Sequence, residues 1–391
     1  MLGLANPIQS YAWGAVDGLA PLVGAPQTGE RQAELWIGAH PAAPSTTPAG
    51  DGARRTLADA VAADPTTLLG PDVVERYGAR LPFLLKVLAI GGPLSIQLHP
   101  DPDQAAAGFA REEDAGIPID APERSFKDPF AKPEVLVALT PTWVLVGFRR
   151  GSDAAARLRS LGPEARPLAD LVVDQPDARR ALVHLLTADA AEREALAHLA
   201  ATRAGAGDDA RSWVRRLAAA YPGDATALAP LVLDLRQLHP GEGVFLPAGV
   251  PHAYLQGAGV ELMAASDNVI RGGLTPKHVD TGTLVDLLAP PGVGVEPMPG
   301  DGVALGIRRY APPVPDIALH RIEAGSRAMA VPTGSGPALA VATGGSAVLT
   351  TDDDRVELGE GRAVLVPPGE RASCRVRGPG VVWWATTGAD G

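Results

Sequence analysis

The chain has 391 residues, of which 46% are hydrophobic and 20% are charged, and its formal net charge is -11 at pH 7. A chain of this length and apolar content can bury a large core, and its length predicts two or three structural units. The negative charge and the lack of clustered Lys and Arg exclude nucleic acid from the expected partners.

The start of the chain, MLGLANPIQSYAWG, has neither a basic flank nor a long apolar run. No window of the sequence approaches the roughly 18 uninterrupted apolar residues that a membrane helix needs. We therefore expect a cytoplasmic protein without a membrane partner, and we expect it to be a monomer.

From about residue 80 to 148, short apolar runs are separated by Pro, Gly and Asp, which is typical of strands in a compact sheet. From 151 to 222, leucines such as Leu182, Leu185 and Leu186 recur at helical spacing. Asp189 with Glu192 three residues later predicts a helix start. The pattern predicts an α-helical insert over residues 151–222.

Strands are predicted again after the insert, in LVLDLRQLHPGEGVFLPAGVPHAYLQ and in GVELMA. A passage rich in Pro and Gly, residues 287–302, predicts a boundary before a last strand-rich unit. We expect residues 1–150 and 223–290 to form one unit around the insert, and residues 291–391 to form another.

Two segments of the chain resemble each other: GEGVFLPAGVPHAY (241–254) and GEGRAVLVPPGERASC (359–374) share a turn, an apolar strand and a Pro-x-Gly corner. The first segment fits the second motif of the cupin barrel, G-x5-P-x-G-x2-H, which ends at His252. Such a corner presents the His on the inner face of a small barrel, where ligands converge. The second segment has Ala372 at the matching position, so we expect a metal only in the first barrel.

Polar and apolar side chains alternate in PLSIQLHPD (93–101). In a strand, Gln97 and His99 project from the same face, so both can reach one ion at about 2.0–2.2 Å. Burying such a face without partners would cost on the order of 1–3 kcal/mol per group. A metal clamp is therefore the favoured interpretation, and a hydrogen-bonded polar core is the alternative.

In KPE (132–134), Pro133 starts the next predicted strand, and Glu134 lies where an inward carboxylate would complete a set with Gln97, His99 and His252. The only cysteine, Cys374, excludes a Cys-based zinc finger. Mixed nitrogen and oxygen ligands suit Zn²⁺, with Fe²⁺ or Mn²⁺ able to compete.

Together the motifs of the chain resemble those of the type I mannose-6-phosphate isomerases, also called phosphomannose isomerases. In chain order they read QSYAWG, AELWIGAHPAAPS, LPFLLKVL, PLSIQLHPD, KPE, LPAGVPHAYLQG and ELMAASDNVIRGGLTPKHVD, and they cover most of residues 1–285 outside the insert. The resemblance implies a mostly β fold of two cupin-like (jelly-roll) β-barrel units plus a helical domain. It also implies one zinc ion per chain, held by Gln97, His99, Glu134 and His252, and interconversion of mannose 6-phosphate and fructose 6-phosphate through an enediol.

The resemblance also implies further site residues. Ser95 and Lys86 match phosphate partners, and five other residues match positions of the pocket: Lys132, Glu261, Asp267, Arg271 and Lys277. The family commonly has Asn-His before the Lys-Pro-Glu, whereas this chain has Phe130 and Ala131. A mechanism that makes that His an essential acid or base would fail here.

Residue chemistry assigns provisional roles within this set. Glu261 is the favoured base, because it lies alone between Val260 and Leu262, and a positioned base contributes about 10²- to 10⁴-fold. Lys132 or a water on the zinc ion is the alternative proton carrier. Asp267 could assist ring opening, and Arg271 could offset the charge of the enediolate.

Two other functions stay open on the sequence alone. A ferrous oxygenase would use His99, Glu134 and His252 as a two-His, one-carboxylate triad, although Gln97 would occupy a position that oxygen needs. A non-catalytic sugar-phosphate-binding module would use four ligands to close the zinc site.

Overall fold

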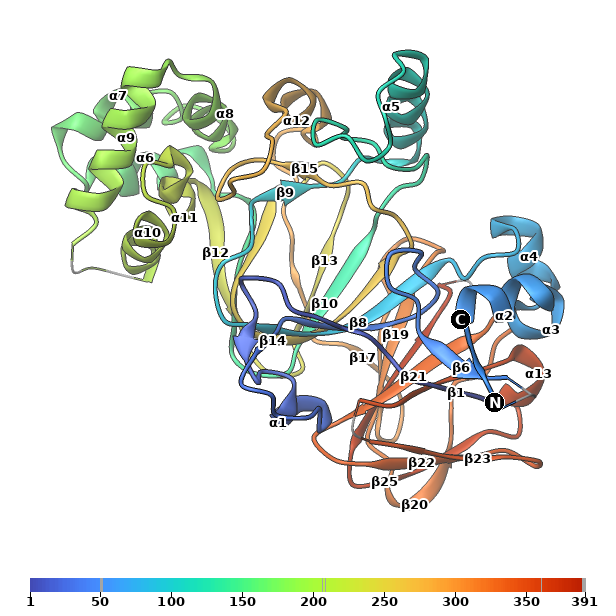
Figure 1. Cartoon of the computed structure of the whole chain (residues 1–391). Coiled ribbons are helices and arrows are strands. Elements are labelled where there is room, and N and C mark those ends of the chain that lie inside the picture. The colour runs from blue at the N-terminus through green and yellow to red at the C-terminus, as the bar shows by residue number, and fades with distance from the viewer. Residues whose placement is uncertain (50–51, 206, 208, 360, 389–391) are drawn as a thin grey trace.

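Figure 1 shows two groups of strands and a set of helices to one side of them. The structure is a computed structural model, and it describes residues 1–49, 52–205, 207, 209–359 and 361–388. This arrangement confirms the predicted mostly β fold with two cupin-like units and a helical domain. Residues 389–391 of the predicted last unit lie outside the described residues, and the exact domain boundaries stay predictions.

The first unit is built on an 11-stranded sheet. Its main path consists of β16 (Pro297–Met298), β13 (Gly243–Leu246), β10 (Glu134–Ala138), β14 (His252–Ala264), β8 (Phe83–Ile90), β5 (Glu34–Ile37) and β2 (Ile8–Gln9). Off this path lie β9 (Gln97–Leu98), β11 (Thr142–Phe148), β12 (Leu233–Leu238) and β15 (Ile270–Arg271). The long strand β14 ties the unit together, because different parts of it pair with β10, β8, β11 and β9.

We call the first unit the first barrel, although its described strands do not form a closed ring. Alternation along these strands decides which side chains point to its inner face. On β8, Leu88 lies in the same apolar cluster as Leu136 of β10, inside the barrel. Side chains of a strand alternate between its two faces, so Lys86 and Glu134, each two residues earlier, also point inward. The barrel interior is therefore apolar at one end and charged at the other.

The helical part comprises α6 (Gly151–Arg159), η1 (Pro163–Ala165), α7 (Arg166–Asp170), α8 (Arg179–Thr187), α9 (Ala190–Arg203), α10 (Asp209–Ala220), η2 (Ala225–Leu228) and α11 (Ala229–Val232). Leu182 and Leu185 are buried in its core. The Asp189 side chain accepts a hydrogen bond from the Glu192 amide and caps α9, as predicted. The helices continue past residue 222, because η2 and α11 follow without an intervening strand.

The end of the helical part contacts a loop of the barrel. The amide of Leu274 donates hydrogen bonds to Asp224 Oδ2 (2.9 Å) and to Thr226 Oγ1 (3.1 Å). Gly273 has a φ of 109°, and a Cβ there would lie 2.2 Å from Thr226 Oγ1. Only glycine fits so close an approach in this conformation, so the helices fix the loop that follows Arg271.

The last unit consists of a seven-stranded and a four-stranded sheet. The larger sheet contains β1 (Leu2–Leu4), β24 (Ala363–Val366), β21 (Ala338–Thr343), β26 (Val381–Thr386), β19 (Ala318–Ile322), β18 (Ile307–Tyr310) and β17 (Asp301–Ala304). The smaller contains β20 (Gly325–Ala330), β25 (Arg375–Gly378), β22 (Ala347–Thr350) and β23 (Arg355–Leu358). Trp384 lies in the core between these sheets, whereas its neighbour Trp383 packs against the first unit.

Two features of the last unit differ from the sequence expectation. Strand β1 falls in the range 1–150 that we assigned to the first unit, but it pairs with β24. The second copy of the repeat also departs from the first: β24 is followed by the short helix α13 (Pro368–Arg371), where β13 of the first copy is followed by a corner and β14.

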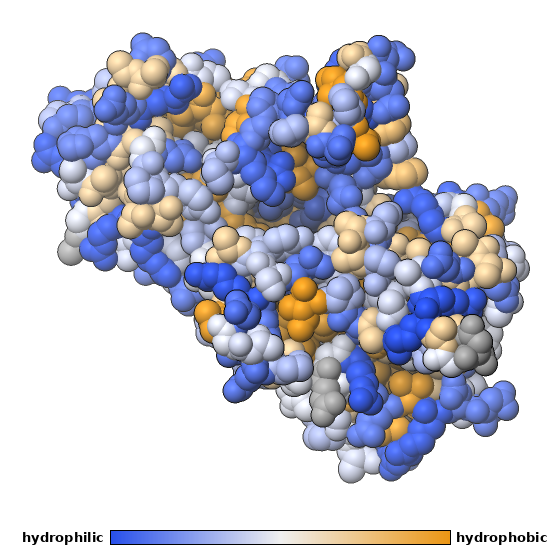
Figure 2. Space-filling model, viewed as in Figure 1, coloured by the Kyte–Doolittle hydropathy of each residue, from blue (hydrophilic) through white to orange (hydrophobic). Residues whose placement is uncertain are grey.

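The remaining elements lie around these cores. They are β3 (Ala15–Val16), β4 (Arg31–Gln32), β6 (Thr46–Pro48), β7 (Arg54–Thr56), α1 (Ala20–Val23), α2 (Leu57–Ala63), α3 (Pro65–Leu69), α4 (Pro71–Tyr77), α5 (Pro102–Asp114) and α12 (Thr281–Leu287). None of the helices within the described ranges has the length and apolar character to cross a bilayer. On the face drawn in Figure 2, apolar side chains form scattered groups among hydrophilic ones.

Candidate metal centre and substrate pocket

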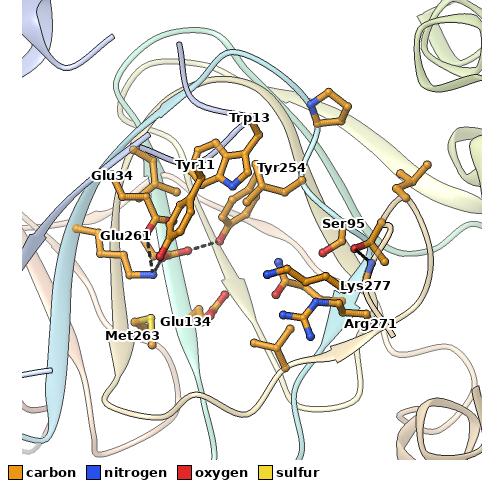
Figure 3. Close-up of a pocket in the computed structure, with 18 of the residues that line it drawn as sticks. Tyr11, Trp13, Glu34, Ser95, Glu134, Tyr254, Glu261, Met263, Arg271 and Lys277 are labelled. Carbon is orange, nitrogen blue, oxygen red and sulfur yellow. Dashed lines mark hydrogen bonds and ion pairs between the residues drawn. The ribbon is translucent and has the colours of Figure 1, made fainter. Parts of the chain in front are cut away.

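A pocket of about 470 Å³ opens at the charged end of the first barrel. Its wall includes nine of the eleven predicted site residues: Lys86, Ser95, Gln97, Lys132, Glu134, Glu261, Asp267, Arg271 and Lys277. The other two, His99 and His252, lie behind this wall in contact with Glu134. The structure thus gathers residues from distant parts of the chain around one cavity (Figure 3).

Three of the four predicted metal ligands form a buried cluster. His99 Nε2 lies 3.3 Å from Glu134 Oε1, and His252 Nε2 lies 3.7 Å from Glu134 Oε2. The ligand atoms of the three residues all lie within 4.8 Å of one another. The two imidazole rings have centroids 5.0 Å apart, so they face a common space.

Backbone carbonyls orient both imidazole rings. His99 Nδ1 bonds to the carbonyl of Asn268 (2.7 Å), and His252 Nδ1 bonds to the carbonyl of Val250 (3.0 Å). A carbonyl can only accept, so each Nδ1 carries a proton, and in the neutral form of each ring the lone pair is on Nε2. Both Nε2 atoms are buried and have no hydrogen-bond partner among the described residues. Such buried, unpaired nitrogens beside a carboxylate fit a divalent metal ion.

Gln97 reaches the cluster through strand pairing. It is paired directly opposite His252 between β9 and β14. Side chains directly opposite each other in an antiparallel pair lie on the same face, with Cβ atoms about 4.5–5.5 Å apart. The amide oxygen of Gln97 can therefore supply the fourth ligand, beside His252.

Burial and neighbouring charges shift the pKa values of two members of this cluster, His252 and Glu134. Burial, with a contribution from His99, lowers the pKa of His252 to about 4. Burial would raise the pKa of Glu134, but Lys132, whose ammonium lies 3.0 Å from Glu134 Oε1, and His99 bring that pKa well below its usual range. At neutral pH His252 is therefore a neutral imidazole beside the charged carboxylate of Glu134, and these are the forms that bind a metal ion.

A second charged group is centred on Glu261, which lies on strand β14 next to the strand of Glu134. Its carboxylate accepts a hydrogen bond from the Tyr254 hydroxyl (2.9 Å) and lies 3.2 Å from Lys86 Nζ. Burial raises the pKa of Glu261, and the charges of Glu134 and Glu34 raise it further, against the opposing effect of Lys86. A buried carboxylate with a raised pKa is the usual form of a general base.

Lys86 is held between two carboxylates. Its ammonium lies 3.6 Å from Glu34 Oε2 as well as 3.2 Å from Glu261 Oε2. In Figure 3, Glu34 and Glu261 lie at one side of the pocket, and Ser95, Arg271 and Lys277 lie at the other. Lys86 therefore already has anionic partners, at a distance from the predicted phosphate residue Ser95.

Arg271 and Lys277 form a cationic corner of the pocket next to Ser95 (Figure 3). Burial lowers the pKa of Lys277, and the charge of Arg271 lowers it further. Burial also lowers the pKa of Arg271. In the described part of the chain neither cation forms an ion pair with an acidic side chain. Two adjacent cations without acidic partners suit a dianionic group such as phosphate.

Asp267 lies at the rim of the pocket and bonds to a histidine that the sequence did not single out. His40 Nε2 lies 3.1 Å from Asp267 Oδ1, and this hydrogen bond lowers the pKa of Asp267. His40 Nδ1 accepts a hydrogen bond from the amide of Ala42 (3.3 Å), so Nε2 carries the proton.

Sequence reasoning missed several residues of the pocket, chiefly Glu34, His40 and Tyr254. Glu34 had a local signal in the sequence, because it is a charged residue directly before the apolar Leu35 on β5. His40 follows that strand and had none. The departures at Phe130 and Ala131 lie outside this pocket, where the Phe130 ring stacks 3.7 Å from the guanidinium carbon of Arg80.

The fold and the site together define a cupin-like protein with a candidate metal site and a pocket that has a cationic corner. Residues 1–151 match the family model for the phosphomannose isomerase type I catalytic domain. The mannose-6-phosphate isomerase of Salmonella typhimurium is 37% identical over 386 residues and covers 94% of each chain, and that of Escherichia coli is 42% identical over 290 residues, 73% of this chain and 74% of the other. The crystal structure of a holo, zinc-bound mannose 6-phosphate isomerase superposes with a TM-score of 0.89 at 33% identity, covering 99% of both chains.

These similarities extend over the barrels and the helical part alike. The chain belongs to the type I phosphomannose isomerase family.

Proposed function

We propose that this chain interconverts mannose 6-phosphate and fructose 6-phosphate with one bound zinc ion. The observation that carries the proposal is the buried cluster of His99, Glu134 and His252, with two unpaired imidazole nitrogens directed at one space. Relatives along nearly the whole chain are named for this activity, and a solved relative is zinc-bound. A bound zinc ion would stabilise negative charge on the oxygens of the enediolate, an effect worth several kcal/mol.

We assign metal binding, proton transfer and ring opening to residues of the pocket as follows. Gln97, His99, Glu134 and His252 hold the ion. Glu261 moves the proton between the two carbons, with Lys86 and Tyr254 fixing its carboxylate. Lys132 stays near Glu134 as a second candidate proton carrier, and Asp267 assists ring opening at the rim.

The phosphate binds, in this proposal, at Ser95, Arg271 and Lys277. Lys86 was expected to be a phosphate partner, but its two carboxylate partners favour a role beside Glu261. Arg271, expected to offset enediolate charge, is adjacent to Lys277 and can serve the phosphate as well.

A coupled assay with mannose 6-phosphate tests the activity. Turnover is expected with the zinc-loaded protein, to be lost on chelation, and to return when zinc is added back. Binding of sugar phosphate without turnover would favour the binding-module alternative, and oxygen uptake on iron loading would favour the oxygenase. Monomeric state, cytoplasmic location and the absence of a nucleic-acid partner stay predictions, the first of which gel filtration checks.

The cationic corner gives a separate prediction. Replacing Lys277 by Met is expected to raise KM for mannose 6-phosphate by about 10- to 100-fold, because a hydrogen bond to a charged group contributes about 1.5–3 kcal/mol. Inhibition by inorganic phosphate is expected to weaken in parallel. Lys127→Met is the control, because the Lys127 ammonium bonds to the carbonyls of Ile119 and Ala121 instead of lining the pocket. An equal rise of KM in both variants would contradict the assignment.

A further inference from the structure

Asn268 is fully buried, although none of the predicted roles involves it. Its side-chain oxygen accepts hydrogen bonds from the amides of Lys127 (2.7 Å) and Asp128 (3.3 Å). Its side-chain nitrogen donates to the carbonyls of Asp128 (2.7 Å) and Phe130 (2.8 Å). Both ends of the side-chain amide are therefore hydrogen-bonded to residues 127–130, which come shortly before Lys132 and Glu134 in the chain.

The main chain of Asn268 serves a metal ligand at the same time. Its carbonyl accepts the hydrogen bond from His99 Nδ1 (2.7 Å), across 169 positions of sequence. His252 differs, because its carbonyl partner Val250 is only two residues away. The orientation of His252 is thus local, whereas that of His99 depends on where a distant segment is held.

Neighbouring residues strengthen the same connection. The Ser266 hydroxyl donates to the carbonyl of Phe130 (3.1 Å) and accepts from the amide of Asn268 (3.2 Å). The amide of Asp267 donates to Asp128 Oδ2 (2.8 Å). Asn268, Ser266 and residues 127–130 form what we call the Asn268 link.

We infer that Asn268 is a positioning residue of the metal centre, which sets the geometry between His99 and Glu134 through the Asn268 link. The carbonyl that orients His99 is present in any residue at this position, but the side-chain amide fixes where that carbonyl lies. Outer partners of metal ligands typically account for about 10- to 100-fold in metal affinity. The inference rests on the zinc site of the proposed function and adds a residue that touches neither ion nor substrate.

Zinc affinity measured by competition with a chromophoric chelator tests the inference. In Asn268→Ala the zinc dissociation constant is expected to rise about 10- to 100-fold. The matched control is Asn6→Ala: the Asn6 amide also joins distant segments, donating to the carbonyl of Gly361 (2.7 Å) and accepting from the Ser45 hydroxyl (2.8 Å). That variant is expected to lose stability and to keep the zinc affinity of the unsubstituted protein.

The absorption spectrum of the cobalt-substituted protein provides a readout that a purely structural role would not change. The cobalt bands are expected to shift in Asn268→Ala and to stay fixed in Asn6→Ala. If Asn268→Ala does not fold, the same zinc-affinity measurement is made on Ser266→Ala. That variant is expected to lose about threefold to tenfold in zinc affinity.

Unchanged zinc affinity and an unchanged cobalt spectrum in Asn268→Ala, together with lowered stability, would overturn the inference and leave the proposed function intact. Failure of the unsubstituted protein to bind zinc would overturn the proposed function itself and the inference with it.

Discussion

Replacing Glu134 by Gln is expected to remove zinc binding and to lower turnover by on the order of 10³-fold, since metal assistance supplies several kcal/mol and each 1.36 kcal/mol is tenfold. Among the described residues, Glu134 is the only carboxylate in the cluster with His99 and His252, and Lys132 already keeps it ionised. The neutral amide keeps the shape of the side chain and loses the charge that the cation needs. Zinc content after gel filtration and turnover in the coupled assay measure the two effects.

Glu112→Gln is the matched control for this variant. Glu112 is also a buried carboxylate paired with a cation, because its Oε2 lies 3.0 Å from Arg124 Nε, but it belongs to α5 and not to the pocket wall. Its replacement is expected to cost stability and to leave zinc content unchanged. Full zinc occupancy in Glu134→Gln would refute the ligand role of Glu134.

Sequence periodicity predicted the charged face of the barrel because alternation is local. Glu134 on β10 and Glu261 on β14 each lie between apolar neighbours, so the inward position of one polar residue follows from its neighbours. The prediction for Gln97 and His99 assumed that one strand contains both residues, which the structure does not have. Strand β9 contains only Gln97 and Leu98, and His252 lies opposite Gln97 because of strand pairing.

Contacts between distant segments could not be predicted in this way. Alternation of residues with a period of two indicates that Leu2–Leu4 can form a strand. It does not indicate that the pairing partner of this strand is β24. The pair of His40 and Asp267 likewise joins two loops whose sequences carry no common pattern. Helix α5 had a usable signal that we did not apply, because Asp101 and Gln104 form a capping box at its start.

Replacing Glu261 by Gln is expected to lower kcat by about 10²- to 10⁴-fold with little change in KM, because the variant loses a proton acceptor and keeps the hydrogen-bonding shape. The raised pKa of Glu261 fixes the sign of the pH dependence: the carboxylate is the active form, so kcat falls as pH drops through that pKa. The unsubstituted protein should show this acidic limb, and the residual activity of Glu261→Gln should lack it.

Glu34→Gln is the control for Glu261→Gln, because Glu34 also pairs with Lys86. Comparing the two variants distinguishes the loss of a base from the loss of a negative charge beside that lysine. Its kcat is expected to fall less than about tenfold, the smaller effect of a lost surrounding charge. Incorporation of deuterium from D2O at C2 of mannose 6-phosphate measures proton abstraction directly and should nearly vanish only in Glu261→Gln. Equal exchange in the two variants would show that another group is the base, and Lys132, which lines the same pocket, would then be the next candidate.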